Sequence, residues 1–281
     1  MTAGPLPAAG AARWTGECSG PGAGGGSTAD REPAAGGEPP AATTSALSTA
    51  YDGYAREYTK LLLGDRSEHL AETVALVRTL LAAGEAEEAG WPGPLNRLVD
   101  LACGPGLVSA ELAADGWNVT GVDASWELVG IARARLPRVL HADATATGLP
   151  PGADAVVSTY THTDVAAWPA LVAEARRLLR PGGVLVYVGA HPAFVGPHIR
   201  RTPGRRWTAH VAAGYYHDPS PRFHGPGLTR GGLREHVGVR HLTIPTLLEP
   251  VLASGWREVR LVEDPADPPT LLGFRAVRDD R

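Results

Sequence analysis

The sequence predicts an α/β fold in which a mostly parallel sheet is covered by helices on both faces. Short valine-rich segments alternate with stretches of helical periodicity from residue 97 to residue 189, which is typical of a sheet buried on both sides. The glycine turn Cys103-Gly104-Pro105-Gly106 follows the first such segment, and the carboxylate of Asp123 follows the second. Glycines let the backbone approach a ligand and the acid can accept hydrogen bonds from a ribose, so these features indicate a site for an adenosine-containing cofactor.

The individual elements follow from periodicity and turn chemistry. Arg180-Pro181-Gly182-Gly183 is a strong turn signal between the predicted helix at 165–179 and the strand after it. Further helices are expected at 107–114, 125–135 and 244–253. Strands are expected at 97–102, 118–122, 139–142, 155–160, 184–189, 258–263 and 271–277.

The chain divides into three predicted parts. Residues 1–48 consist mainly of Gly, Ala, Pro, Ser and Thr and bury too little apolar surface to offset the entropy of ordering, so we expect a disordered tail. Helical periodicity in residues 49–92 predicts an N-terminal helical cap, and residues 93–281 form the cofactor-binding domain. Regular patterns stop at about 190–242 within that domain, a length typical of a lid or substrate-binding insertion after the fifth strand.

Composition limits the classes of function. The 281 residues are 43% apolar and carry a net charge of −4, which favours neither a nucleic-acid partner nor a membrane surface. No apolar run approaches the roughly 18 residues that span a bilayer. The two cysteines, Cys18 and Cys103, give neither a disulfide framework nor a zinc spacing, and we expect a cytoplasmic location. The pattern does not predict the oligomeric state.

Several short motifs occur in a characteristic order. They are Tyr51-Asp52-x-x-Ala55-x-x-Tyr58, Asp100-x-x-x-Gly104-x-Gly106, Asp123, His141-Ala142-Asp143-Ala144 and Arg180-Pro181-Gly182-Gly183. In this order the motifs resemble the class I S-adenosylmethionine-dependent methyltransferases, over roughly residues 50–281. The resemblance implies a Rossmann-like three-layer sandwich with a seven-stranded, mostly parallel sheet whose last strand is antiparallel. It also implies that S-adenosyl-L-methionine binds across the carboxyl ends of the first strands.

The resemblance assigns roles to the residues of the first two strands. Asp100 holds the glycine turn and helps to receive the ammonium group of the cofactor; the alternative is a cap for the following helix. Gly104 and Gly106 allow the nucleoside to approach closely. Asp123 chelates the ribose hydroxyls; the alternative is again a helix cap, although Ser125 serves that helix better.

Further cofactor contacts are implied on either side of these strands. Asp143 accepts a hydrogen bond from the adenine amino group, with the backbone of Ala144 nearby, or is an ordinary loop aspartate. Tyr51 and Tyr58 close over the methionine end, where a ring face attracts a sulfonium cation, or are packing residues of a helix. Tyr160 lines the mouth of the same site.

Two histidines are candidate catalytic residues. His162 directly follows the fourth strand, where the methyl group is presented, and a histidine suits proton abstraction near neutral pH. The alternative is that His162 orients its loop and touches no substrate. His191 leaves the fifth strand and is the residue of the insertion that we expect to face the methyl group.

The insertion supplies candidate acceptor contacts, because aromatic rings with a few polar tips suit a flat, partly polar molecule. These candidates are Tyr215, Tyr216, His217 and His241. Five histidines between 191 and 224 are seven residues apart except for one interval of twelve, but prolines or glycines interrupt every interval. This spacing cannot place them on one helix face, and we expect no metal site.

The sequence therefore predicts methyl transfer from S-adenosylmethionine to an O, N or C nucleophile of a small aromatic or heteroaromatic metabolite, such as one of secondary metabolism. A NAD-type oxidoreductase is the first alternative. It would favour a third glycine where Ser109 stands and a free amide where Pro105 stands. The second alternative is a noncatalytic protein that binds the cofactor but has lost its acceptor site.

Overall fold

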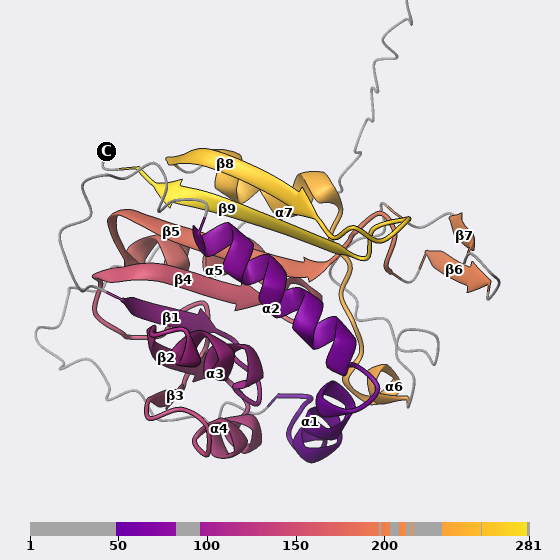
Figure 1. Cartoon of the computed structure of the whole chain (residues 1–281), viewed down its shortest axis with the longest axis horizontal. Coiled ribbons are helices and arrows are strands. Elements are labelled where there is room, and N and C mark those ends of the chain that lie inside the picture. The colour runs from indigo at the N-terminus through magenta and orange to yellow at the C-terminus, as the bar shows by residue number, and fades with distance from the viewer. Residues whose placement is uncertain are drawn as a thin grey trace, which may run out of the picture. The chain divides into compact units, whose positions relative to one another are not determined.

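A seven-stranded sheet organises the molecule, in the order β3-β2-β1-β4-β5-β9-β8 (Figure 1). The computed structural model describes residues 49–82, 96–196, 198–202, 208–211, 215, 232–253 and 255–279. These residues belong to one unit that extends from Thr44 to Arg281. The tail predicted at residues 1–48 lies outside the described residues.

The strands follow the predicted pattern. The first five run parallel to one another, whereas β9 pairs antiparallel with both β5 and β8. This arrangement confirms the predicted mixed sheet with its antiparallel last strand. The bounds are β1 Arg97–Leu101, β2 Asn118–Asp123, β3 Val139–His141, β4 Ala153–Thr159, β5 Leu179–Ala190, β8 Trp256–Glu263 and β9 Leu271–Arg278.

Helices cover both faces of the sheet, and alternate residues of the central strands supply two hydrophobic cores. Leu98 of β1 packs in the core under α2 and α3, whereas its neighbour Val99 packs in the core under α5 and α7. Because both faces are buried, the central strands are apolar along most of their length. The helix bounds are α1 Ala55–Leu63, α2 Ser67–Ala82, α3 Leu107–Ala114, α4 Trp126–Ala132, α5 Trp168–Leu178, α6 Leu233–Val237 and α7 Ile244–Ala253.

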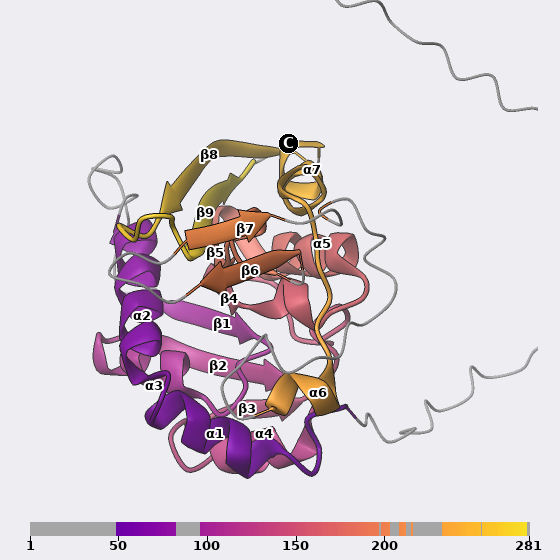
Figure 2. The same ribbon diagram turned by 90° about the vertical axis from the view of Figure 1, so that its right-hand side faces the viewer.

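The carboxyl ends of the parallel strands meet at one edge, which Figure 2 views from the front. The described part of the predicted insertion contains α6 and an antiparallel hairpin of β6 (Ile199–Thr202) and β7 (Thr208–Val211). Helices α1 and α6 both lie at this edge (Figure 2). No helix in the described ranges is both long and apolar enough to cross a membrane.

Gly106, the N-cap residue just before α3, has a left-handed backbone, φ +76°, and a Cβ atom there would lie 3.1 Å from Cβ of Ala132. Gly148 has a similar φ of +70°, but nothing lies within 4 Å of its Cβ position. Gly106→Ala should therefore lower the free energy of unfolding by about 2–4 kcal/mol, from backbone strain and overpacking together. Gly148→Ala should cost only the strain, about 1–2 kcal/mol. Urea denaturation measures both, and equal losses would contradict this account of Gly106.

Candidate functional site

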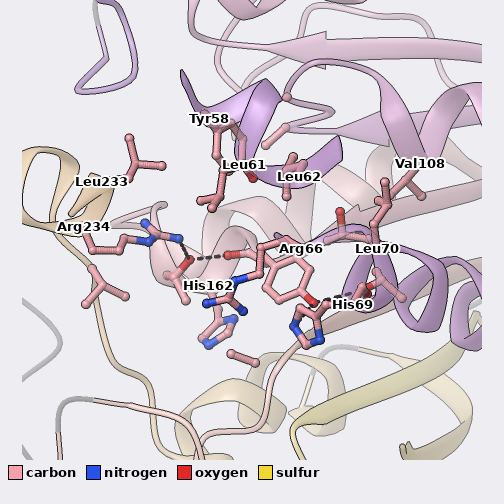
Figure 3. A pocket seen from close by; sticks show the side chains of 18 of the residues that line it. Tyr58, Leu61, Leu62, Arg66, His69, Leu70, Val108, His162, Leu233 and Arg234 are labelled. Atoms are coloured by element: carbon pink, nitrogen blue, oxygen red, sulfur yellow. Dashed lines mark hydrogen bonds between the residues drawn. The ribbon is translucent and has the colours of Figure 1, made fainter. Parts of the chain in front are cut away.

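Two adjoining cavities open at the edge where the parallel strands end. The first, which we call the acidic cavity, encloses about 320 Å³ and has the carboxylates of Asp123, Asp143 and Asp164 in its wall. The second, the basic cavity, has the side chains of Arg66, Arg234 and Arg240 in its wall and is shown in Figure 3. Both cavities share the residues Tyr58, Ala102, Gly104, Thr159 and Tyr160.

The turn after β1 forms part of this shared wall. Ala102, Gly104 and Gly106 all have positive φ angles, of 59°, 57° and 76°, so the chain bends sharply between strand and helix. A Cβ atom on Gly104 would meet only Cε1 of Tyr58, at 3.7 Å, so this glycine faces the cavities as predicted. Gly106 lines neither cavity and instead permits α3 to pack against Ala132 of α4.

Asp123 ends β2 beneath this turn. Its Oδ2 accepts a hydrogen bond of 2.8 Å from the backbone amide of Gly104, and its Oδ1 accepts one of 2.8 Å from the amide of Ser125. The hydroxyl of Ser125 caps α4 by accepting from the amide of Leu128. Burial raises the pKa of Asp123 to about 6, against the opposing effect of the two amides. Since Ser125 caps the helix, Asp123 is available at the wall of the acidic cavity.

Asp100 lies behind the turn and is 1% exposed. Its Oδ2 accepts a hydrogen bond from the hydroxyl of Ser109, and its Oδ1 has no partner among the described residues. Burial raises the pKa of this carboxyl to about 7. Asp100 reaches neither cavity wall. Its carboxylate accepts a hydrogen bond from a side chain of α3, and the N-cap residue of that helix, Gly106, supplies no side-chain cap.

The other predicted cofactor contacts lie around the acidic cavity. Asp143 is exposed, and its Oδ1 accepts 2.8 Å hydrogen bonds from the amide and the hydroxyl of Thr145. Ala144 and Tyr51 are part of the same wall. The rings of Tyr51 and Tyr58 are tilted, with their centroids 5.0 Å apart, and the Tyr51 hydroxyl donates to Asp164 at 3.3 Å.

Tyr160 separates the two cavities and has a left-handed backbone, φ +58°. Its hydroxyl lies 2.8 Å from Nε2 of His69 and 2.9 Å from the hydroxyl of Thr73. Burial raises the pKa of this phenol above its usual range. Two hydrogen bonds from α2 therefore fix the ring of a residue that the sequence analysis placed only at the mouth.

His162 follows β4 in the short 3₁₀ turn Thr161–Thr163 and lines the basic cavity. Its Nδ1 is hydrogen-bonded to the hydroxyl of Tyr187, and within the described part of the chain no protein atom bonds to Nε2. Burial lowers the pKa of His162 to about 3. The imidazole is therefore neutral throughout the physiological range.

Of the two predicted histidines of the insertion, His241 lines a cavity and His191 does not. Nε2 of His191 lies 2.8 Å from Oε1 of Glu263, and Nδ1 accepts from the amide of Ala193 at 3.2 Å. His191 lines neither cavity, so the structure does not bring it together with His162. His241 does line the basic cavity.

Tyr215 supports His241 rather than lining the cavity itself. The carbonyl of Tyr215 lies 3.0 Å from Nε2 of His241, and its hydroxyl accepts from the amide of Ile244 at 2.9 Å. Tyr216 and His217 lie outside the described residues. The described residues include no group of three or more His, Cys, Asp or Glu side chains placed to hold a metal ion.

The sequence analysis missed the residues that α1, α2 and α6 bring to the basic cavity. These include Arg66 from the connection before α2, His69 from the first turn of α2, and Arg234 from α6, which pairs with Asp164 at 2.9 Å. Asp164 does not cap α5, because Ala167 occupies that position. The one sequence signal for these residues was the position of Arg66 in the break between two amphipathic helices. The pairing of Arg234 with Asp164 could not be predicted, because no periodicity connects α6 to a loop 70 residues earlier.

Comparison with known proteins identifies a domain within the chain. A model of the methyltransferase domain matches residues 99–187, which contain the glycine turn, Asp123, Asp143 and His162. Over these residues the chain is similar to methyltransferases, and the match favours the predicted methyltransferase over the oxidoreductase alternative.

Curated relatives match only parts of the chain. An uncharacterized methyltransferase of Synechocystis is 32% identical over 131 residues, 42% of this chain and 61% of the relative. The demethylmenaquinone methyltransferase of Beutenbergia cavernae is 38% identical over 96 residues, 33% of this chain and 40% of the relative. The chain thus spans less than two thirds of the length of either relative.

A solved structure shares the fold more completely. This S-adenosylmethionine-dependent methyltransferase of Thermotoga maritima, a possible histamine N-methyltransferase, has a TM-score of 0.56 at 17% identity. The match covers 82% of this chain and 98% of that one.

The residues of the acidic cavity fit S-adenosylmethionine, the cofactor that the sequence predicts. Its wall contains three carboxylates and, among the described residues, no Lys, Arg or His side chain. A sulfonium and an ammonium group are both cations, which carboxylates in a partly buried wall attract. The unpartnered Oδ1 of Asp100 adds an acceptor behind the turn.

Asp100→Asn tests how much the buried carboxylate of Asp100 lowers the free energy of unfolding. Because the pKa of the carboxyl rises from 3.8 to about 7 on folding, its ionised form destabilises the fold increasingly as pH rises from about 4 to 7. Without ligand, the variant should therefore gain about 2–4 kcal/mol of unfolding free energy at pH 8 and almost nothing at pH 4. Denaturation at both pH values measures this, with Asp65→Asn at an exposed carboxylate as the control. A gain independent of pH would contradict the assignment.

Proposed function

We propose that the protein transfers the methyl group of S-adenosylmethionine to an O, N or C nucleophile of a small aromatic or heteroaromatic acceptor. The observation that carries this proposal is the pair of adjoining cavities of opposite charge, which share a wall at Gly104 and Tyr160. When bound, the cofactor supplies an activated methyl group on a cationic sulfur. A donor in one cavity and an acceptor in the other would meet at this shared wall.

The chain's residues have distinct tasks in holding the cofactor. Asp123 receives the ribose hydroxyls through the lone pairs that Gly104 and Ser125 leave unused. Asp143 and the backbone of Ala144 receive the adenine. The rings of Tyr51 and Tyr58 cover the methionine end, and Asp100 contributes negative charge from behind the turn.

The wall of the basic cavity supports an acceptor with a ring. Its apolar side chains include Leu61, Leu62, Leu70, Val108, Leu233 and Val239. The rings of Tyr58 and Tyr160 lie in the same wall, and such a lining suits a flat molecule with few polar groups. The Beutenbergia cavernae relative is a demethylmenaquinone methyltransferase, and its ring-bearing acceptor supports the same class.

Alignment does most of the catalytic work in this proposal. Holding two reactants in line can lower a barrier by about 7–11 kcal/mol, and displacement at a methyl group needs no covalent help from the protein. If the nucleophile carries a proton, His162 accepts it at Nε2 in the tautomer whose Nδ1–H donates to Tyr187. With a pKa of about 3, His162 is a weak base, so it assists only as the proton becomes acidic in the transition state.

Calorimetry with S-adenosylhomocysteine tests cofactor binding. The wild type should bind it, and Asp123→Ala should weaken binding by about 1–3 kcal/mol because buried polar partners lose their acceptor. Since the pKa of Asp123 is about 6, affinity should also rise between pH 5 and pH 8 as the carboxylate ionises. Asp65→Ala is the exposed control and should bind like the wild type. Failure of the wild type to bind at millimolar concentration would overturn the proposal.

His162→Ala tests the base. Mass spectrometry of metabolite extracts incubated with methyl-labelled cofactor identifies an acceptor, and turnover is then measured on that molecule. The variant should lose about tenfold or more in kcat with nearly unchanged affinity for S-adenosylhomocysteine. The wild-type pH profile should show no ionisation of His162 between pH 5 and pH 8, because this histidine is already neutral there.

Three results would count against parts of this account. Equal turnover in His162→Ala would remove His162 from the mechanism. Tyr187→Phe, which removes only the hydrogen bond to Nδ1, should lower kcat less than His162→Ala does, and an equal or larger loss would contradict the role of Nε2. Cofactor binding without labelling of any metabolite would favour the noncatalytic alternative.

A further inference from the structure

Arg66 has the position of a ligand-binding cation. It lies in the short connection between α1 and α2, where its backbone amide donates to the carbonyl of Leu61 at 2.9 Å. Figure 3 shows its side chain among those that enter the basic cavity. Within the described ranges, no carboxylate and no hydrogen-bond acceptor pairs with its guanidinium group. A partly buried cation without a partner is costly, which suggests that a ligand supplies the missing anion.

The described wall of the basic cavity contains no Asp or Glu to balance Arg66. His69 in the same wall is half-buried and contacts Glu72. Burial and the positive charge of Arg66 together lower the pKa of this imidazole, against the opposing effect of Glu72. Arg234 differs from Arg66, because Asp164 already pairs with it. A ligand that enters this cavity would therefore have to supply the negative charge that balances Arg66.

We propose that the methyl acceptor carries a carboxylate and that Arg66 binds it. This inference rests on the proposed function and names the class of acceptor. A planar guanidinium can form two parallel hydrogen bonds to a carboxylate. The ring of such an acceptor lies along Leu61, Leu62 and Leu70, and its nucleophile points towards the shared wall at Tyr160.

The competing assignment gives Arg66 to the carboxylate of the cofactor itself. Arg66 is absent from the wall of the acidic cavity, which favours the acceptor. However, Tyr58, Ala102 and Gly104 belong to both walls, so the experiment has to separate the two ligands.

The experiment compares 2-naphthoate with 2-naphthamide, which have the same ring and differ in charge. Each is titrated by calorimetry into the full-length protein, with and without saturating S-adenosylhomocysteine. The wild type should bind the naphthoate about tenfold more tightly, as expected for one charge-assisted pair. Arg66→Gln should abolish this preference, and Arg66→Lys, which keeps the charge but loses the paired hydrogen bonds, should retain part of it.

Arg56→Gln is the matched control, since Arg56 is an exposed arginine on α1 outside both cavity walls. It should keep the full preference, and all variants should bind S-adenosylhomocysteine within about twofold of the wild type. Equal binding of the two probes by the wild type would overturn the proposal. So would a loss of S-adenosylhomocysteine affinity in Arg66→Gln, because Arg66 would then hold the cofactor. If the wild type fails to bind S-adenosylhomocysteine, the proposed function fails, whereas the titration without it still tests Arg66.

Discussion

The site depends on the hydrogen bond from the amide of Gly104 to Asp123, which ties the turn after β1 to the end of β2. The turn holds three residues at positive φ, including the non-glycine Ala102, and needs such an anchor to keep its shape. The amide of Ser125 fixes the second oxygen of the same carboxylate. The acid at the cavity wall is thus oriented by the backbone before any ligand arrives, which lowers the entropic cost of binding.

Opposite charges are kept apart across the shared wall. The acidic cavity has carboxylates and the basic cavity has arginines, and the ion pair of Asp164 with Arg234 joins one wall to the other. This pair neutralises charge where the two cavities approach each other. A cationic donor is thereby favoured on one side of Tyr160 and disfavoured on the other.

The sequence predicts the sheet well because its signals are local. Valine-rich strands, turn glycines and helical periodicity lie within each element, and the predicted bounds of α3 and α7 match the structure. The basic cavity was predicted less well because its contacts join distant segments. Nothing near His191 in the sequence indicates that Glu263, 72 residues later, holds its ring away from both cavities. Likewise, the pKa of His162 follows from burial under tertiary packing, which periodicity does not encode.

The region that matches the family model, residues 99–187, contains Asp123 and Asp143 but neither Arg66 nor Arg234. Those arginines come from the connection before α2 and from α6, which lie outside the matched region. On the proposed function, the carboxylates at the cofactor and the arginines at the acceptor are therefore encoded in separate stretches of the gene. Substitutions in the flanking segments would then alter which acceptor binds without changing either aspartate.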